Sequence, residues 1–126
     1  RYTEPSLVLS AGEVSGWDWS PPHESGAVMS GATAEALCRH MCAVLTEGTA
    51  APAAPRTVSA AGKTGTAESG EYTGGREKIV STFAGFFPAD DPKYVAVVVS
   101  ERDSDADPVA IRVFTRLAET LYPAEP

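Results

Sequence analysis

The sequence predicts an α+β fold: a three-stranded antiparallel sheet with a C-terminal helix on one face and a second helix before the sheet. Two segments with apolar residues at three- and four-residue spacing predict the helices, and three β-branched or aromatic runs predict the strands. The links between these runs are too short for parallel crossovers, so we expect antiparallel neighbours. We expect a single segment of 126 residues, with a loop or ribbon over residues 1–29, helix over 30–48, strands over 57–101 and the last helix over 107–122.

The first 29 residues are rich in Gly, Pro and Ser and predict a loop or small ribbon. Residues 6–10 could form a short strand, and the pair Pro21 and Pro22 excludes helix at that point. Trp17 and Trp19 are interpreted as a covered apolar patch, with a binding surface as the alternative.

A helix is predicted over residues 31–46, with Ser30 as its N-cap and Gly48 just beyond its end. Its apolar stripe predicts a core-facing side and consists of Ala34, Leu37, Cys38, Met41, Val44 and Leu45. Two cysteines one helical turn apart form neither a disulfide framework nor a zinc site. We therefore interpret Cys38 and Cys42 as small core thiols.

Strands are predicted over residues 57–67, 79–87 and 94–101, where β-branched and aromatic residues gather. A glycine-containing loop over residues 69–78 should connect the first two strands, and a tight turn over 88–92 the last two.

The last helix is predicted over residues 108–121, with Asp107 as its N-cap and Pro108 at the first helical position. Its expected buried stripe consists of Ala110, Val113, Phe114, Leu117 and Leu121.

The formal net charge of −7 argues against nucleic acid and against an anionic membrane surface as partners. Nucleic acid and anionic membrane surfaces both require clustered Lys and Arg. The longest apolar run, over residues 94–99, is far shorter than the roughly 20 residues that a membrane helix needs. The acidic residues over 101–107 are spaced like a solvated loop that leads into a helix cap, not like a calcium site. We expect no metal and no organic cofactor.

Residues 61–67, with the letters AGKTGTA, carry the chemistry. A phosphate-binding loop would need Gly where Thr57 stands, and a helix after the motif. A strand of small residues with a solvated lysine is a second reading. The third is the Lys-Thr-Gly strand of penicillin-recognising serine enzymes. A strand edge suits that chemistry, because Lys63 is a cation, Thr64 and Thr66 project to one side, and Gly65 lets a substrate backbone lie close.

The surroundings of the motif strengthen the third reading. The letters VLTEGT over residues 44–49, the motif itself and STFAGFFPADDPKY over 81–94 follow one another in order. Over about residues 28–122 the chain resembles the C-terminal part of the transpeptidase domain of class B penicillin-binding proteins. The resemblance implies a serine D,D-transpeptidase that cross-links peptidoglycan at the extracytoplasmic face of the bacterial membrane, held by an N-terminal helix that is not in this chain.

The resemblance also implies roles for four residues. Lys63 would polarise the catalytic site near the nucleophile, and the amide of Thr66 would complete the oxyanion hole. Lys63, Thr64, Gly65 and Thr66 would bind the substrate, a stem peptide that ends in D-Ala-D-Ala, or a β-lactam. The family's base is another lysine, so Glu68 and Glu71 are interpreted as solvated loop residues.

Two motifs of the family are missing. No Ser or Thr has Lys three residues later, and the absence of Asn excludes a Ser-x-Asn element. We expect a C-terminal fragment that is inactive alone, whose last strand is a bare edge that favours self-association. A non-catalytic penicillin-binding-like interaction domain and an unrelated acidic domain with a chance motif are the alternatives.

Overall fold

The computed structural model describes residues 2–3, 24–104 and 109–123, which fall into two units, 1–34 and 35–126. In the first unit, strands β1 (Tyr2–Thr3) and β2 (Glu24–Ser25) pair antiparallel. The possible strand over residues 6–10, together with Trp17 and Trp19, lies outside the described residues.

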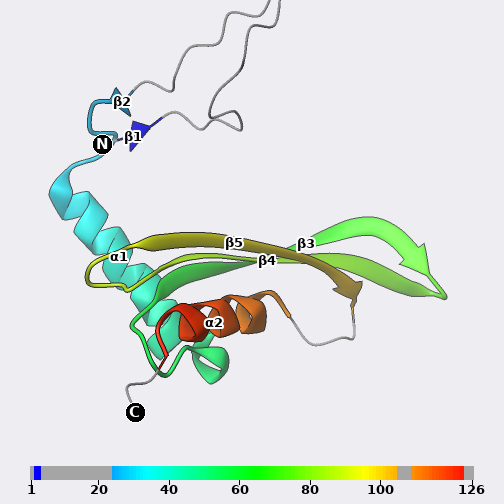
Figure 1. Ribbon diagram of the computed structural model, residues 1–126. Coiled ribbons are helices and arrows are strands. Elements are labelled where there is room, and N and C mark those ends of the chain that lie inside the picture. Colours follow the sequence, from blue (N-terminus) through cyan, green and yellow to red (C-terminus); the bar gives the residue numbers. More distant parts are fainter. Residues whose placement is uncertain (1, 4–23, 105–108, 124–126) are drawn as a thin grey trace, which may run out of the picture. The chain divides into compact units, whose positions relative to one another are not determined.

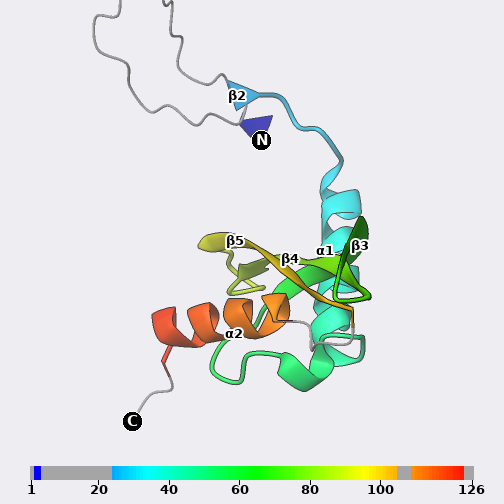
Figure 2. The same cartoon turned by 90° about the vertical axis from the view of Figure 1, so that its right-hand side faces the viewer.

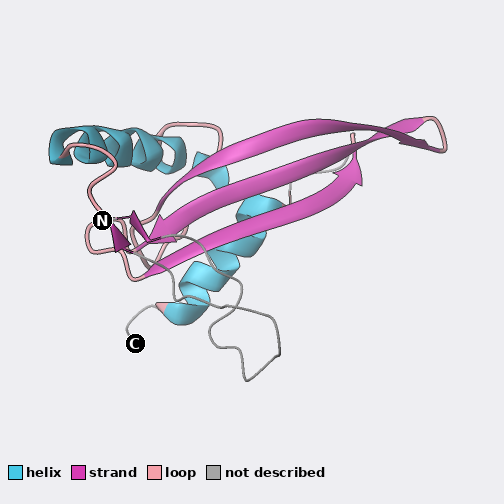
Figure 3. Ribbon diagram, turned by 90° about the horizontal axis from the view of Figure 1, so that it is seen from above, coloured by secondary structure: helices cyan, strands magenta, loops and turns pink. Residues whose placement is uncertain are grey.

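The second unit contains the predicted three-stranded antiparallel sheet, in the order β3 (Ala61–Thr73), β4 (Arg76–Phe87) and β5 (Tyr94–Asp103). Figure 3 shows the strands side by side in this order. Helix α2 (Ala110–Leu121) lies against one face of the sheet, as Figures 1 and 2 show. The α+β fold predicted from the sequence is therefore confirmed, with helix α1 (Gly31–Thr46) before the sheet.

The prediction of a loop over residues 69–78 was wrong, because these residues extend β3 and β4 into one long hairpin. Its turn consists of Gly74 and Gly75, with φ angles of +60° and +81°, and Thr73 pairs with Arg76 across it. Two residues with positive φ match the right-handed twist of the flanking strands, which is the two-residue hairpin geometry. Gly70, with φ of +73°, lies in the register shift between Glu68 and Tyr72.

Aromatic rings hold α2 on the sheet. The Phe114 ring of α2 lies 4.6 Å from the Phe83 ring and 5.5 Å from the Phe87 ring, measured between centroids. All three side chains are fully buried. Tyr94 and Tyr122 extend the cluster, since each contacts Phe87 and they contact each other at 6.1 Å. Rings at these distances and tilts add favourable energy beyond their buried area.

The buried face of α2 differs from the predicted stripe. Ala110 and Phe114 are buried as expected, together with Ile111 and Ala118. The predictions for three residues were wrong, because Val113, Leu117 and Leu121 are each more than two-fifths exposed. The small side chains of Ala110 and Ala118 let the helix approach the phenylalanine rings closely, so the contact face turns toward them. The helix begins at Ala110 in the structure, and the expected cap residues 107 and 108 lie outside the described residues.

Helix α1 has the predicted bounds. The amide of Thr33 donates a hydrogen bond of 3.1 Å to the Ser30 hydroxyl, and the amide of Gly48 bonds the Ala43 carbonyl at 2.8 Å beyond the last turn. Its apolar stripe is buried only near the C-terminal end. Leu45 is buried in the core, whereas Leu37 is 48% exposed.

The two cysteines are half-buried rather than fully buried in the core. Burial raises the pKa of the Cys42 thiol, and the neighbouring Cys38 raises it further. A raised pKa keeps this thiol protonated and unreactive near neutral pH.

We predict that Phe114→Ala lowers the free energy of unfolding by about 3–5 kcal/mol, because it leaves a cavity between two buried rings. Urea denaturation followed by circular dichroism measures this loss. Tyr72→Ala is the control, since Tyr72 is 67% exposed on the hairpin and its truncation should change the free energy by less than about 0.5 kcal/mol. Equal losses in the two variants would contradict the central role of Phe114.

An ion pair ties the hairpin to the end of β5. The ammonium of Lys78 lies 2.7 Å from the Asp103 carboxylate, and the Arg76 guanidinium lies 3.9 Å from it. The hydrogen bond and charge of Lys78 hold the pKa of Asp103 below its ordinary value of 3.8. A lowered pKa in the folded state means that the pair stabilises the fold at neutral pH and loses this contribution as the pH falls through that pKa.

We predict that Lys78→Gln raises the pKa of Asp103 toward 3.8, as measured by carboxyl NMR titration. The difference in unfolding free energy between this variant and the parent chain should vanish below the pKa of Asp103. Lys93→Gln is the matched control, because Lys93 pairs with Asp91 at 2.7 Å and should leave Asp103 unchanged. An unchanged Asp103 pKa in Lys78→Gln would refute the assignment.

Candidate active site on the edge strand β3

The motif from Lys63 to Thr66 lies on β3, which among the described residues pairs with β4 alone. Thr64 pairs with Phe83, and Thr66 pairs with Ser81. Because Phe83 is fully buried beneath α2, its packing fixes the position of this part of the edge strand. The open edge leaves backbone amide and carbonyl groups of the motif without a neighbouring strand in the described part of the chain.

The two threonines of the motif line one cavity of about 240 Å³. Strand residues alternate between faces, so Thr64 and Thr66 lie on the side of the sheet that α2 covers. The first turn of α2, with Ala110 and Ile111, forms part of the opposite wall. Thr49, Gly65, Ser81, Thr82 and Arg102 complete the lining. The same-side placement of the two hydroxyl groups agrees with the sequence prediction.

Lys63 is exposed and does not line this cavity. Lys63 pairs with Ala84, and it alternates with Thr64 along the strand, so the two side chains start from opposite faces of the sheet. Its ammonium nevertheless donates a hydrogen bond of 2.8 Å to the Thr64 carbonyl and lies 3.4 Å from the Thr64 hydroxyl. The charge of Lys63 is therefore held beside the hydroxyl of the next residue.

Packing within the sheet leaves little room for a side chain at two positions of the motif. A Cβ on Gly62 would lie 2.4 Å from the Phe83 ring, and one on Gly65 would lie 2.2 Å from the Thr82 hydroxyl. The clash at Gly62 is the more severe, because the ring is fixed in the core and the Ala84 carbonyl lies 2.8 Å away. Packing thus explains Gly62 without any ligand, whereas the Thr82 hydroxyl beside Gly65 can rotate away from an added Cβ.

Arg102 is a residue of the site that the sequence analysis missed. It belongs to β5, and its Nε donates a hydrogen bond of 2.8 Å to the hydroxyl of the buried Ser81. Its Nη1 donates to the carbonyls of Asp103 and Ser104 at 3.0 and 3.2 Å. Along β5 the residues that face α2 alternate with exposed valines, and Arg102 falls on the inward set. The available sequence signal for Arg102 was a charged residue at a strand position that alternation assigns to the buried face.

The site can bind a carboxylate. Thr64, Thr66 and Arg102 line a single small cavity, and the ammonium of Lys63 lies 3.4 Å from the Thr64 hydroxyl. Hydroxyl and guanidinium groups donate the hydrogen bonds that carboxylate oxygens accept. No cluster of three or more His, Cys, Asp or Glu side chains that could hold a metal occurs in the described residues.

One protein family matches most of the chain. The penicillin binding protein transpeptidase domain matches residues 1–119, and the chain therefore belongs to this family. The match extends N-terminal to residue 28, where the resemblance read from the sequence began. A search of curated proteins finds no match.

The family consists of enzymes that act on the cell wall outside the cytoplasm and bind β-lactams. None of the helices in the described part of the chain is long and apolar enough to cross a membrane.

Proposed function

We propose that this chain forms the carboxylate-recognising wall of the active site of a serine D,D-transpeptidase that cross-links peptidoglycan. The observation that carries the proposal is the shared cavity of Thr64 and Thr66, with Lys63 bound at the strand edge beside it. A stem peptide that ends in D-Ala-D-Ala has a terminal carboxylate, and so do β-lactams. The two threonines bind this carboxylate, and the charge of Arg102 makes the cavity more favourable for an anion.

Lys63 and the amide of Thr66 act on the reacting centre in this proposal. The ammonium raises the positive potential where the nucleophile and the scissile carbonyl meet. The amide of Thr66 donates to the oxyanion that forms on that carbonyl, because alternate residues of an edge strand point their amides to the same side. Gly65 leaves the space between the two threonines free of a side chain.

The nucleophile is not in this chain, because it contains neither Ser-x-x-Lys nor Ser-x-Asn. We propose that these elements belong to another part of the same transpeptidase domain. The parent protein is then anchored at the extracytoplasmic face of the membrane by a helix outside this chain. The isolated 126 residues bind no β-lactam covalently.

We predict that Lys63→Ala and Thr66→Val each slow acylation by fluorescent penicillin about 10- to 10²-fold in the longer protein. Lys63→Ala removes the ammonium charge at the reacting centre, and Thr66→Val removes a hydroxyl that binds the carboxylate but keeps the backbone amide. Thr66→Ser should restore most of the rate, because it keeps the hydroxyl. Glu71→Gln is the matched control: Glu71 is exposed on the same strand beyond the motif and should label like the parent.

Gel fluorescence after timed labelling measures these rates. Full labelling of both Lys63→Ala and Thr66→Val would overturn their roles. Covalent labelling of the isolated chain would show that it has a nucleophile of its own and would overturn the proposed division of the active site.

Within the described residues β5 pairs with β4 alone, and this open edge leads us to propose self-association of this chain. Val95, Val97 and Val99 lie on the sheet face opposite α2 and are 80%, 65% and 63% exposed. An exposed, valine-rich edge strand pairs readily with another copy. Edge-to-edge pairing satisfies the backbone groups of β5 that have no neighbouring strand in the described part of the chain, and it places side chains of the second copy beside these valines.

We predict a molar mass that rises with concentration in light scattering, and a clear reduction of this rise in Val97→Lys, because a charge on an edge strand opposes pairing. Tyr72→Lys is the control, since it adds the same charge to an exposed hairpin site away from β5. A monodisperse, heat-stable monomer at all concentrations would refute the proposal.

A further inference from the structure

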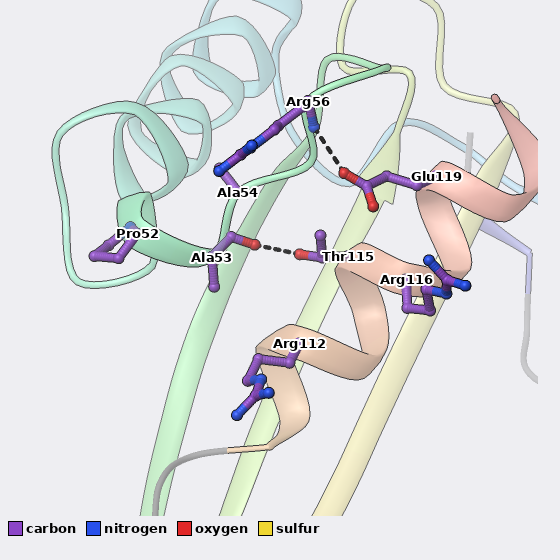
Figure 4. Close-up of a pocket in the computed structure, with 8 residues that line it drawn as sticks. All are labelled: Pro52, Ala53, Ala54, Arg56, Arg112, Thr115, Arg116 and Glu119. Carbon is purple, nitrogen blue, oxygen red and sulfur yellow. Dashed lines mark hydrogen bonds between the residues drawn. The ribbon is translucent and has the colours of Figure 1, made fainter. Parts of the chain in front are cut away.

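A second cavity lies away from the motif, between α2 and the short 3₁₀ helix η1 (Ala51–Ala53). Its volume is about 500 Å³, and Figure 4 shows the side chains that line it. The floor is apolar, with Pro52, Ala53 and Ala54, and the Thr115 hydroxyl donates a hydrogen bond to the Ala53 carbonyl across it. This contact joins η1 to α2 and gives the cavity a fixed base.

Three guanidinium groups surround the floor. Arg112 and Arg116 extend from α2, and Arg56 extends from the segment after η1 (Figure 4). One carboxylate, Glu119, lines the cavity with them. Three cations against one anion stand out in a chain whose net charge is −7. This surface is therefore expected to favour a negatively charged ligand.

The arginines are not neutralised within the described part of the chain. None of the three guanidinium groups forms an ion pair with a described residue. Glu119 is three residues from Arg116, a spacing that permits a pair, yet its carboxylate accepts a hydrogen bond of 3.1 Å from the backbone amide of Arg56. Like charges at the spacing of Arg112 and Arg116 destabilise a helix, so an anion that binds here relieves a repulsion that the fold leaves in place.

The positions of the guanidinium groups select the size of the ligand. Figure 4 shows them at separate points around the cavity, with Arg112 and Arg116 directed to different sides. Guanidinium groups at separate points match an extended chain that carries several carboxylates. Guanidinium groups bind carboxylates through paired hydrogen bonds, and the apolar floor accommodates the aliphatic parts of Glu or Asp side chains.

We propose that this cavity is a docking site for an acidic peptide segment of a partner protein. It is separate from the candidate active site, because no residue lines both cavities. Binding here can therefore be tested on this chain alone, whether or not the proposed transpeptidase role holds.

The test is a titration of a fluorescein-labelled oligoglutamate peptide with the chain, followed by fluorescence anisotropy at low and at physiological ionic strength. We expect saturable binding that weakens with salt. Arg112→Gln and Arg116→Gln should each weaken it about fivefold. Glu119→Gln should strengthen it, because this change removes the negative charge of the lining and keeps a hydrogen-bond acceptor for the Arg56 amide.

The matched control is Arg39→Gln, which removes the same charge from an exposed position of α1 and should leave binding unchanged. Circular dichroism and thermal unfolding confirm that each variant is folded; the exchanged arginines are exposed, and Glu119 is half-buried. Equal weakening by Arg39→Gln would show that only the overall charge matters and would overturn the proposal. Competition by inorganic phosphate at the same concentration as the peptide would overturn it too, because the site would then take a small anion.

Discussion

The packing of Phe114 against Phe83 and Phe87 is the interaction on which the rest of the second unit depends. Their rings join α2 to the central strand β4, and each is fully buried. The hydrogen-bonded ladder then places β3 and β5 on either side of β4. Gly62 and Gly85 belong to the same arrangement, since a Cβ at either position would run into the Phe83 ring at less than 3.0 Å.

This core determines the geometry of the candidate site. Thr64 pairs with Phe83 in the strand ladder. The residue whose ring anchors α2 therefore also fixes the position of Thr64 along the sheet. The first turn of α2 closes the cavity that Thr64 and Thr66 line. A one-residue slip of β3 would turn both hydroxyl groups to the other face, because side chains alternate along a strand. Core packing thereby specifies which face the motif presents.

Local sequence patterns predicted the fold class, the bounds of α1, the three-stranded sheet and the motif on its edge. They could not distinguish a glycine-rich loop from a long hairpin, because Gly74 and Gly75 suit both and only strand pairing decides. Helix periodicity gave an apolar stripe on α2, but tertiary contact with the phenylalanine rings selected Ile111 and Ala118 over Leu117. Arg102 joins the site across β4 from β5, a proximity that exists only in the folded sheet.

Different side chains of helix α2 contribute to the core and to each of the two cavities. Ala110 and Ile111 wall the cavity of the motif, Phe114 and Ala118 enter the core, and Arg112 and Arg116 border the basic cavity. The core contact holds the other two in place, because one rigid helix carries all three sets of side chains. Loss of the Phe114 ring therefore disturbs both cavities together, whereas exchange of an exposed arginine changes the charge of one cavity and leaves the position of the helix unchanged. The two cavities thus share a scaffold and differ in chemistry, with hydroxyl groups dominating one and guanidinium groups the other.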